Sequence, residues 1–162
     1  MSERRFISPE GAQRLGAEAE RLLRVERPRV CNQVSAAAAE GDRSENAEYI
    51  YGKKRLREID KRLQFLGKLL DEMVVVSVPT AAQKVVFLTW VIIEDAAGQR
   101  RSVRIVGQDE TDAGAGHISW RSPVGRALLN KRVDDEVTVE TPGGLAHYVI
   151  IDVGVVEPSG PL

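Results

Sequence analysis

Apolar residues recur at helical spacing through the first part of the chain. The stripe consists of Leu15, Ala19, Leu22, Val30, Val34 and Ala37. Ser8 followed by Pro9 is typical of an N-cap and a first helical position. Pro28 has no backbone N–H to donate, and it interrupts the stripe between Glu26 and Arg29. The pattern therefore predicts a helix that begins at Pro9 and that either bends or has a looser turn near Pro28.

A second helix follows the Gly41-Asp42 break. Its apolar residues, spaced by three and four, are Tyr49, Gly52, Leu56, Ile59, Leu63, Leu66, Leu70 and Met73. This is the a/d pattern of a coiled coil. Because the connecting loop is short, the two helices are predicted to pack antiparallel as a hairpin. About 32 residues per helix, at roughly 1.5 Å each, give a length of about 45–50 Å.

The second half of the chain alternates between strand-like segments and turn residues. Strands are predicted at 85–94, 102–106, 137–140 and 146–153, with turns at Ala96-Ala97-Gly98 and Pro142-Gly143-Gly144. Ser122-Pro123 opens a short helix that runs through Leu129. The predicted fold class is α+β: a helical hairpin followed by a small antiparallel sheet with one helix.

The expected domain boundaries follow from this change in pattern. Residues 1–76 are predicted to form the hairpin, 77–83 a linker, 84–156 the globular domain and 157–162 a flexible tail. Nine of the fourteen glycines and five of the seven prolines lie after residue 76, where turns are expected.

Composition narrows the class of protein. The chain has 162 residues, 43% of them hydrophobic and 29% charged, which is typical of a folded domain. The net charge of −1 argues against a uniformly basic nucleic-acid module. The single cysteine, Cys31, excludes an internal disulfide. The apolar run Val85–Ile93 is too short to cross a membrane, and Met1–Phe6 lacks a signal core, so a cytoplasmic protein without membrane contact is expected.

The turn of the hairpin is acidic. Residues 40–48 carry a net charge of −3, and Asp42 and Glu45 stand three residues apart. Two carboxylates so placed suit a hard cation such as Mg²⁺, with further ligands supplied by a partner. The alternative is helix capping, with Asp42 as N-cap and Glu45 completing a capping box. The two interpretations are compatible if Ser44 caps the helix while the acids point outward.

A basic stripe follows on the second helix. Its members are Lys53, Lys54, Arg55, Arg57, Lys61 and Arg62, and residues 53–62 carry a net charge of +4. Lys54, Arg57 and Lys61 fall on the side away from the apolar seam. Such a stripe can follow a phosphate backbone. The alternative is a solvated flank with intrahelical pairs such as Lys54–Glu58.

Motifs of self-sufficient catalysis are absent from the sequence. The two histidines, His117 and His147, stand apart and are interpreted as strand or loop residues rather than metal ligands. There is no nucleophile elbow and no phosphate-binding loop. The sequence therefore predicts a protein that acts through a partner rather than an enzyme.

Several stretches together resemble one family. Gly41-Asp42-Arg43-Ser44-Glu45-Asn46-Ala47-Glu48-Tyr49 is similar to the tip motif of bacterial transcript cleavage factors of the GreA/GreB family. The run from Lys53 to Arg62 resembles its GreB branch in particular. Three other stretches fit the family: 7–11, 104–110 and 118–129. The resemblance covers about residues 6–153.

The resemblance implies a mechanism that spacing alone does not. It implies that the hairpin enters the secondary channel of RNA polymerase. There Asp42 and Glu45 would position the catalytic Mg²⁺ and its water, so that the polymerase cleaves backtracked RNA. Gly41, Ser44, Asn46 and Tyr49 would support the tip. The six residues of the basic stripe would contact the RNA 3′ segment. No cofactor would be bound stably by the chain alone, since the Mg²⁺ is shared with the polymerase.

The resemblance also implies how the second half acts. It would be an FKBP-like domain that docks on the β′ rim coiled coil of the polymerase, through Ser119, Arg121 and Pro123. Relatives often carry an acid where this chain has Arg121, so the charge at a rim contact through that position would be reversed.

Two alternative functions stay open: a channel-binding regulator that does not stimulate cleavage, and a GreA-like rather than GreB-like factor. A third alternative, from another class of protein, is a general coiled-coil scaffold or a nucleic-acid-binding hairpin. A monomer is expected.

Overall fold

The chain divides into two compact units in the computed structural model, which describes residues 4–41 and 46–162. One unit is Ala12–Met73. The other combines the residues up to Gly11 with Val74–Leu162. The linker at 77–83 and the tail at 157–162 stay predictions. The fold class is α+β, as the sequence indicated.

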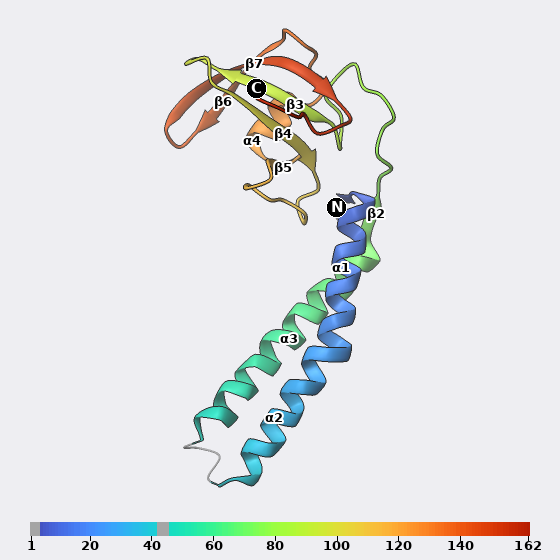
Figure 1. Cartoon of the computed structure of the whole chain (residues 1–162), viewed down its shortest axis with the longest axis vertical. Coiled ribbons are helices and arrows are strands. Elements are labelled where there is room, and N and C mark those ends of the chain that lie inside the picture. The colour runs from blue at the N-terminus through green and yellow to red at the C-terminus, as the bar shows by residue number, and fades with distance from the viewer. Residues whose placement is uncertain (1–3, 42–45) are drawn as a thin grey trace. The chain divides into compact units, whose positions relative to one another are not determined.

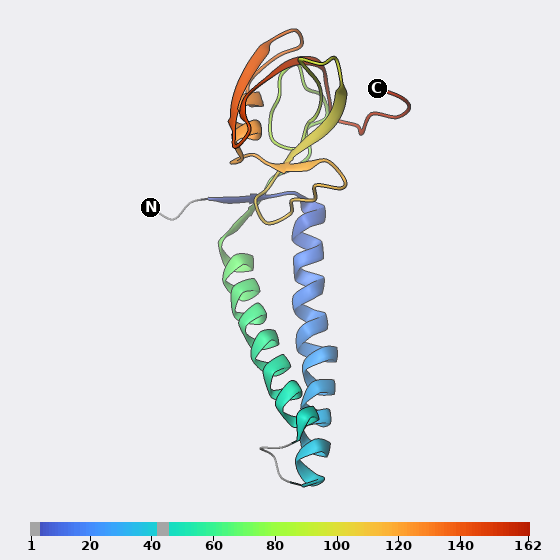
Figure 2. The ribbon, with the colours of Figure 1, turned by 90° about the vertical axis from the view of Figure 1, so that its left-hand side faces the viewer.

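The first arm of the hairpin is continuous but not uniform. It consists of α1 (Pro9–Arg21), a π-helical turn (Leu22–Glu26) and α2 (Arg27–Ala39). The N–H of Arg27 donates to the carbonyl of Leu22, five residues back instead of four. This wider turn stands directly before Pro28, where the helix lacks a donor and the ring needs room. The looser turn predicted near Pro28 is confirmed as this π-helical turn, and Figure 2 shows the arm continuing through it as one helix.

The second arm is α3 (Ala47–Glu72), and it is capped by Asn46. The side-chain oxygen of Asn46 accepts the N–H of Tyr49 at 3.2 Å, and its amide nitrogen donates to the carbonyl of Ala37 at 2.7 Å. The capping role expected for Asp42 is therefore wrong, since the helix begins four residues later. One side chain caps α3 and also ties it to the end of α2.

The seam between the helices follows most of the predicted apolar positions. Gly52, Ile59 and Leu66 are buried. Leu69, which the heptad assignment missed in favour of Leu70, is also buried. At Gly52 a Cβ atom would stand 2.5 Å from Cγ2 of Val34, so this glycine lets α2 and α3 approach closely. The two helices lie side by side in Figure 1. Within 4–41 and 46–162, no helix is long and apolar enough to span a membrane.

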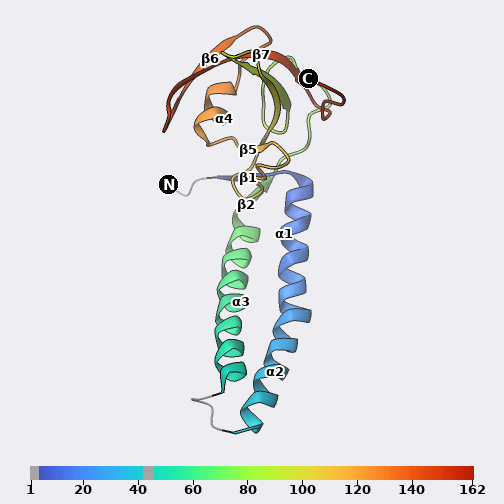
Figure 3. The same ribbon diagram turned by 60° about the vertical axis from the view of Figure 1, so that its left-hand side comes forward.

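The second unit contains a curled five-stranded sheet in the order β5-β4-β3-β7-β6. The strands are β3 (Trp90–Asp95), β4 (Arg100–Val106), β5 (His117–Ser119), β6 (Glu136–Thr141) and β7 (Gly144–Gly154). The sheet is mixed rather than wholly antiparallel, because β5 pairs with β4 in parallel. Figure 3 shows the short helix α4 (Pro123–Leu128) against the inner side of the sheet, where Leu128 joins the core.

The strand predicted at 85–94 begins only at Trp90. Val85 and Leu88 are fully buried, but they lie in an irregular segment. Leu88 has a φ of 69°, and its N–H donates to the carbonyl of Ile105 at 2.7 Å. The apolar run thus reports burial correctly but not strand conformation, because core residues can come from a loop whose backbone groups are satisfied elsewhere.

The start of the chain is bound into this second unit by a buried carboxylate. β1 (Arg5–Ile7) pairs with β2 (Met73–Val75). Glu110, only 8% exposed, accepts the N–H of Ser8 at 2.8 Å, the N–H of Gly107 at 3.0 Å and the hydroxyl of Ser8. We call this arrangement the Glu110 latch. It joins two stretches that lie a hundred residues apart in the sequence.

Candidate functional site

The acidic turn of the hairpin is only partly described. Asp42, Arg43, Ser44 and Glu45 lie outside the described residues, so the metal-binding expectation for Asp42 and Glu45 stays a prediction. Gly41 is exposed with a φ of 148°, a conformation that side-chain-bearing residues rarely adopt. Asn46 is the cap of α3, and Tyr49 supplies the N–H that this cap accepts. The helix ends that flank the turn are therefore held by Asn46.

Two members of the basic stripe are bound to acids of the opposite arm. Arg55 contacts Glu26 at 3.2 Å, as well as Glu58 on its own helix at 3.4 Å. Arg62 donates two hydrogen bonds to the carboxylate of Glu18, at 2.7 and 2.9 Å. These two arginines therefore join the arms of the hairpin.

The other four cations of the stripe face solvent. Lys53, Lys54, Arg57 and Lys61 are exposed, and none forms an ion pair within the part of the chain that the structure describes. The intrahelical pair considered for Lys54 does not form, since Glu58 contacts Arg55 instead. We call these four residues the open cations. Their charge is available to a partner.

Asp60, like Glu18, forms an ion pair with an arginine of the opposite arm. Its carboxylate accepts hydrogen bonds from Arg27 at 2.8 and 3.5 Å across the hairpin. Those hydrogen bonds lower the pKa of Asp60, as the bonds from Arg62 lower the pKa of Glu18. Both acids within the stripe are thus paired: Asp60 with Arg27 of the opposite arm, and Glu58 with Arg55 of its own helix. The open cations therefore have no unpaired acid of residues 53–62 beside them.

The Arg62–Glu18 pair gives the first prediction. Replacing Glu18 by Gln should lower the free energy of unfolding at pH 7 by less than about 1 kcal/mol, because both side chains are partly exposed. Since the pKa of Glu18 is lowered in the folded state from 4.5, the contribution is present above that value. It should disappear as the pH falls through the lowered pKa. Urea unfolding at pH 7 and pH 3 measures this difference.

The matched control for that measurement is Glu20→Gln. Glu20 is also on α1, but its partner, Arg24 at 3.5 Å, lies on the same arm. A loss for Glu18→Gln that persists at pH 3, or that Glu20→Gln equals at pH 7, would contradict a stabilising role for the cross-arm pair.

The three predicted docking residues lie together at the turn from β5 into α4. The hydroxyl of Ser119 accepts the N–H of Arg121 at 3.1 Å, and Pro123 occupies the first turn of α4. The Arg121 guanidinium donates to the side chain of Gln108 at 3.1 Å and lies 6.0 Å from the ring centre of Trp120. Ser119 and Arg121 are half-buried, and Pro123 is exposed. Whether they dock on a partner stays a prediction.

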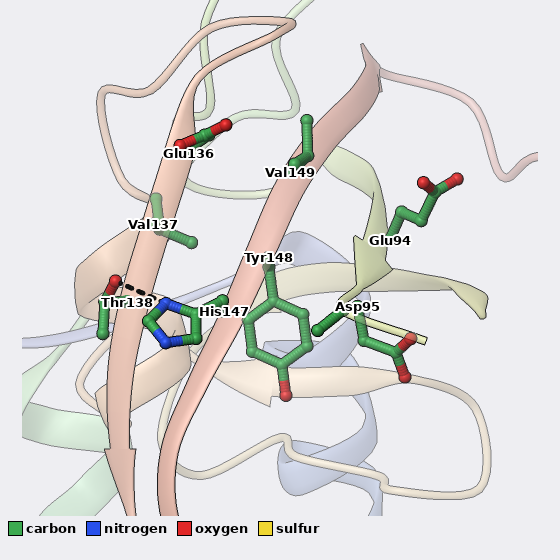
Figure 4. Close-up of a pocket in the computed structure, with 9 residues that line it drawn as sticks. Glu94, Asp95, Glu136, Val137, Thr138, His147, Tyr148 and Val149 are labelled. Carbon is green, nitrogen blue, oxygen red and sulfur yellow. Dashed lines mark hydrogen bonds between the residues drawn. The ribbon is translucent and has the colours of Figure 1, made fainter. Parts of the chain in front are cut away.

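A pocket of about 220 Å³ is lined by residues of β3, β6 and β7 and by Ala96 (Figure 4). His147 lies beside Thr138, with its Nδ1 3.0 Å from the hydroxyl of Thr138. Glu94 is paired with Arg100 at 2.7 Å, and Asp95 accepts backbone N–H groups of its own turn. No cluster of three metal-ligating side chains occurs among the described residues. His117 and His147 are strand residues, as predicted.

Two features escaped the sequence reasoning. The first is the separation of the stripe into paired and open cations, which depends on contacts between the arms. The second is Tyr51, whose side chain is 73% exposed on α3. Tyr51 stands immediately beside a seam residue, Gly52. The spacing of apolar residues alone does not distinguish a solvent-exposed aromatic side chain from one at the edge of the core.

The sequence is similar to known proteins over nearly its whole length. Residues 5–75 match the family described as "Transcription elongation factor, N-terminal", and residues 66–154 match "Transcription elongation factor, GreA/GreB, C-term". The chain is 52% identical over 154 residues to a protein of Yersinia pestis named transcription elongation factor GreB, covering 94% of this chain and 90% of that one. It is 54% identical over 150 residues to the protein of that name from Xanthomonas axonopodis pv. citri, covering 91% and 89%.

A solved structure is also similar. It is the GreA factor homolog 1 (Gfh1) protein of Thermus thermophilus, which is 23% identical with a TM-score of 0.44 and covers 93% of this chain and 99% of that one.

Proposed function

This chain belongs to the GreA/GreB family of transcription elongation factors, and from this we propose that it is a GreB-like transcript cleavage factor. It inserts its hairpin into the secondary channel of bacterial RNA polymerase and stimulates the polymerase's own Mg²⁺-dependent cleavage of backtracked RNA. The observation that carries the proposal is the identity of more than 50% with GreB proteins over nine-tenths of the chain.

The proposed chemistry is supplied jointly by the two proteins. Hydrolysis of a phosphodiester by two metal ions requires one near the attacking water and one near the leaving oxygen. Asp42 and Glu45 provide hard oxygen donors, which suit Mg²⁺. Two carboxylates are too few to hold an ion alone, so they share an ion with the polymerase. The hairpin carries them into the channel, and Ser119, Arg121 and Pro123 contact the rim.

The direct test is a backtracked elongation complex incubated with the purified protein. Acceleration of RNA cleavage, followed by resumed elongation from the new 3′ end, is the expected result. Normal polymerase binding without cleavage would instead favour a channel-binding regulator. Tight, salt-sensitive RNA binding in the absence of polymerase would favour a general RNA-binding hairpin.

A second prediction concerns the open cations. Replacing Lys54, Arg57 and Lys61 together by Gln should slow release of long RNA fragments about tenfold, because three phosphate contacts are lost. Release of dinucleotides should change less than about twofold, since so short an RNA segment does not reach the cations of the stripe. Each contact to a single-strand phosphate contributes about −0.7 to the slope of log binding constant against log salt concentration. The magnitude of that slope should therefore decrease by about 2 in the triple variant.

The control keeps the same change in net charge on the other unit. Lys84, Lys131 and Arg132 are exposed and form no ion pair within the described ranges, so they are replaced by Gln in a second triple variant. Equal loss of long-fragment and dinucleotide release in the first variant, or the same loss in the control, would contradict an RNA-contacting role.

A further inference from the structure

Tyr51 is the most exposed of the chain's large aromatic side chains. It is 73% exposed and forms no hydrogen bond or ring contact with any residue in 4–41 or 46–162. Other surface rings are covered by cations: Arg62 lies 5.3 Å from the ring centre of Phe65, and Arg101 lies 5.6 Å from that of Tyr148. An aromatic face of this size left in water exposes apolar area that a partner would bury.

The surroundings of Tyr51 indicate the chemistry of that partner. Lys54 follows at i+3, one turn along the same side of α3, and it belongs to the open cations. Arg57 and Lys61 continue this cationic surface over about 15 Å of helix. Glu58, two turns beyond Tyr51, has its charge offset by Arg55. The ring therefore stands at one end of a positive strip.

A stacking ring beside a line of cations is the arrangement that binds single-stranded nucleic acid. The cations attract phosphates and the ring stacks on a base, whatever its identity. A protein surface would favour several apolar neighbours around the ring. Here Ile50 is exposed next to it in the sequence, but the exposed side chains one and two turns along the same side of α3 are Lys54 and Arg57. This surface therefore suits single-stranded RNA better than the surface of another protein.

We infer that Tyr51 stacks on a base of the extruded RNA 3′ segment, while the open cations contact its phosphates. This inference rests on the proposed function, because that function supplies the RNA. Tyr51 is then a positioning residue: it holds the RNA along the hairpin and leaves cleavage to the polymerase. Its contribution depends on an RNA segment long enough to reach it.

The test compares two stalled complexes, one backtracked by two nucleotides and one by about ten. Binding of fluorescently labelled full-length protein is measured by anisotropy for each complex. Wild-type protein should bind the second complex more tightly. Tyr51→Ala and Tyr51→Leu should weaken binding to that complex about tenfold, the size of one lost stacking contact. Tyr51→Phe should bind like the wild type, because the ring is retained.

The matched control is Ile50→Ala, which removes the neighbouring exposed side chain of α3, 52% exposed. It should change binding to both complexes by less than about twofold. Equal weakening on both complexes would mean that Tyr51 contacts the polymerase, and would overturn the inference. Wild-type binding that does not increase with the longer segment, or a Tyr51→Leu variant equal to Tyr51→Phe, would overturn it too.

The outcome is separable from that of the proposed function. Binding is measured without cleavage, so a wild type that binds the long segment more tightly through Tyr51 but stimulates no cleavage would leave the stacking role intact. The proposed cleavage function would then be wrong on its own.

Discussion

Asp42→Asn should lower the stimulation of RNA cleavage by at least about 100-fold while leaving polymerase binding within about twofold of wild type. The amide keeps the size of the side chain but removes the negative charge that a hard cation requires. Loss of second-shell partners of a metal already costs 10- to 100-fold, and a direct ligand should cost at least as much. Glu45→Gln should act similarly, because one carboxylate alone leaves the shared ion poorly held.

The measurement is the rate of cleavage in a backtracked complex at saturating factor. Asp71→Asn is the matched control: it makes the same chemical change at an exposed position near the other end of α3. Cleavage stimulated equally by Asp42→Asn and wild type would overturn the proposed role of the tip. Loss of binding together with loss of cleavage would assign Asp42 to docking instead.

The second large effect is expected at the Glu110 latch, and it concerns stability. Glu110→Ala leaves the Ser8 N–H, the Ser8 hydroxyl and the Gly107 N–H without their acceptor in a buried position. Each such loss costs about 1–3 kcal/mol, and entry of water offsets part of it. The free energy of unfolding should fall by about 3 kcal/mol. For a chain of this length the melting temperature should drop by about 10 °C.

Calorimetric melting of two further variants locates the cause. Glu110→Gln keeps one acceptor oxygen and should lie between Glu110→Ala and the wild type. Glu136→Ala removes an exposed acid of β6 and should melt like the wild type. A Glu110→Ala variant that melts at the temperature of the wild type would show that the latch contributes nothing to stability.

The latch also gives a physical reason why two separate stretches carry the family resemblance, since residues 7–11 and 104–110 contact each other.

Local patterns were sufficient for much of the fold. The helices, the break near Pro28, the Ser122 cap and the 142–144 turn were each predicted from a few neighbouring residues, because capping, proline chemistry and hairpin turns act over short range. The Asn46 cap was missed because Asp42, Ser44 and Asn46 are all good N-caps, and only the position of α3 chooses among them. The start of β3 at Trp90 was missed because a buried loop and a buried strand are equally apolar.

The candidate site, too, was predicted in part from the sequence and in part only from the structure. By itself the sequence determined the family, the hairpin and the surplus of positive charge on its second helix, since these depend on residue identity and period. Only the tertiary structure decided which charges are available. Arg55 and Arg62 are bound to acids of the opposite arm, while Lys53, Lys54, Arg57 and Lys61 are not. An ion pair requires its two groups within about 4 Å. Residues 29 or 44 positions apart reach that distance only when the arms pack.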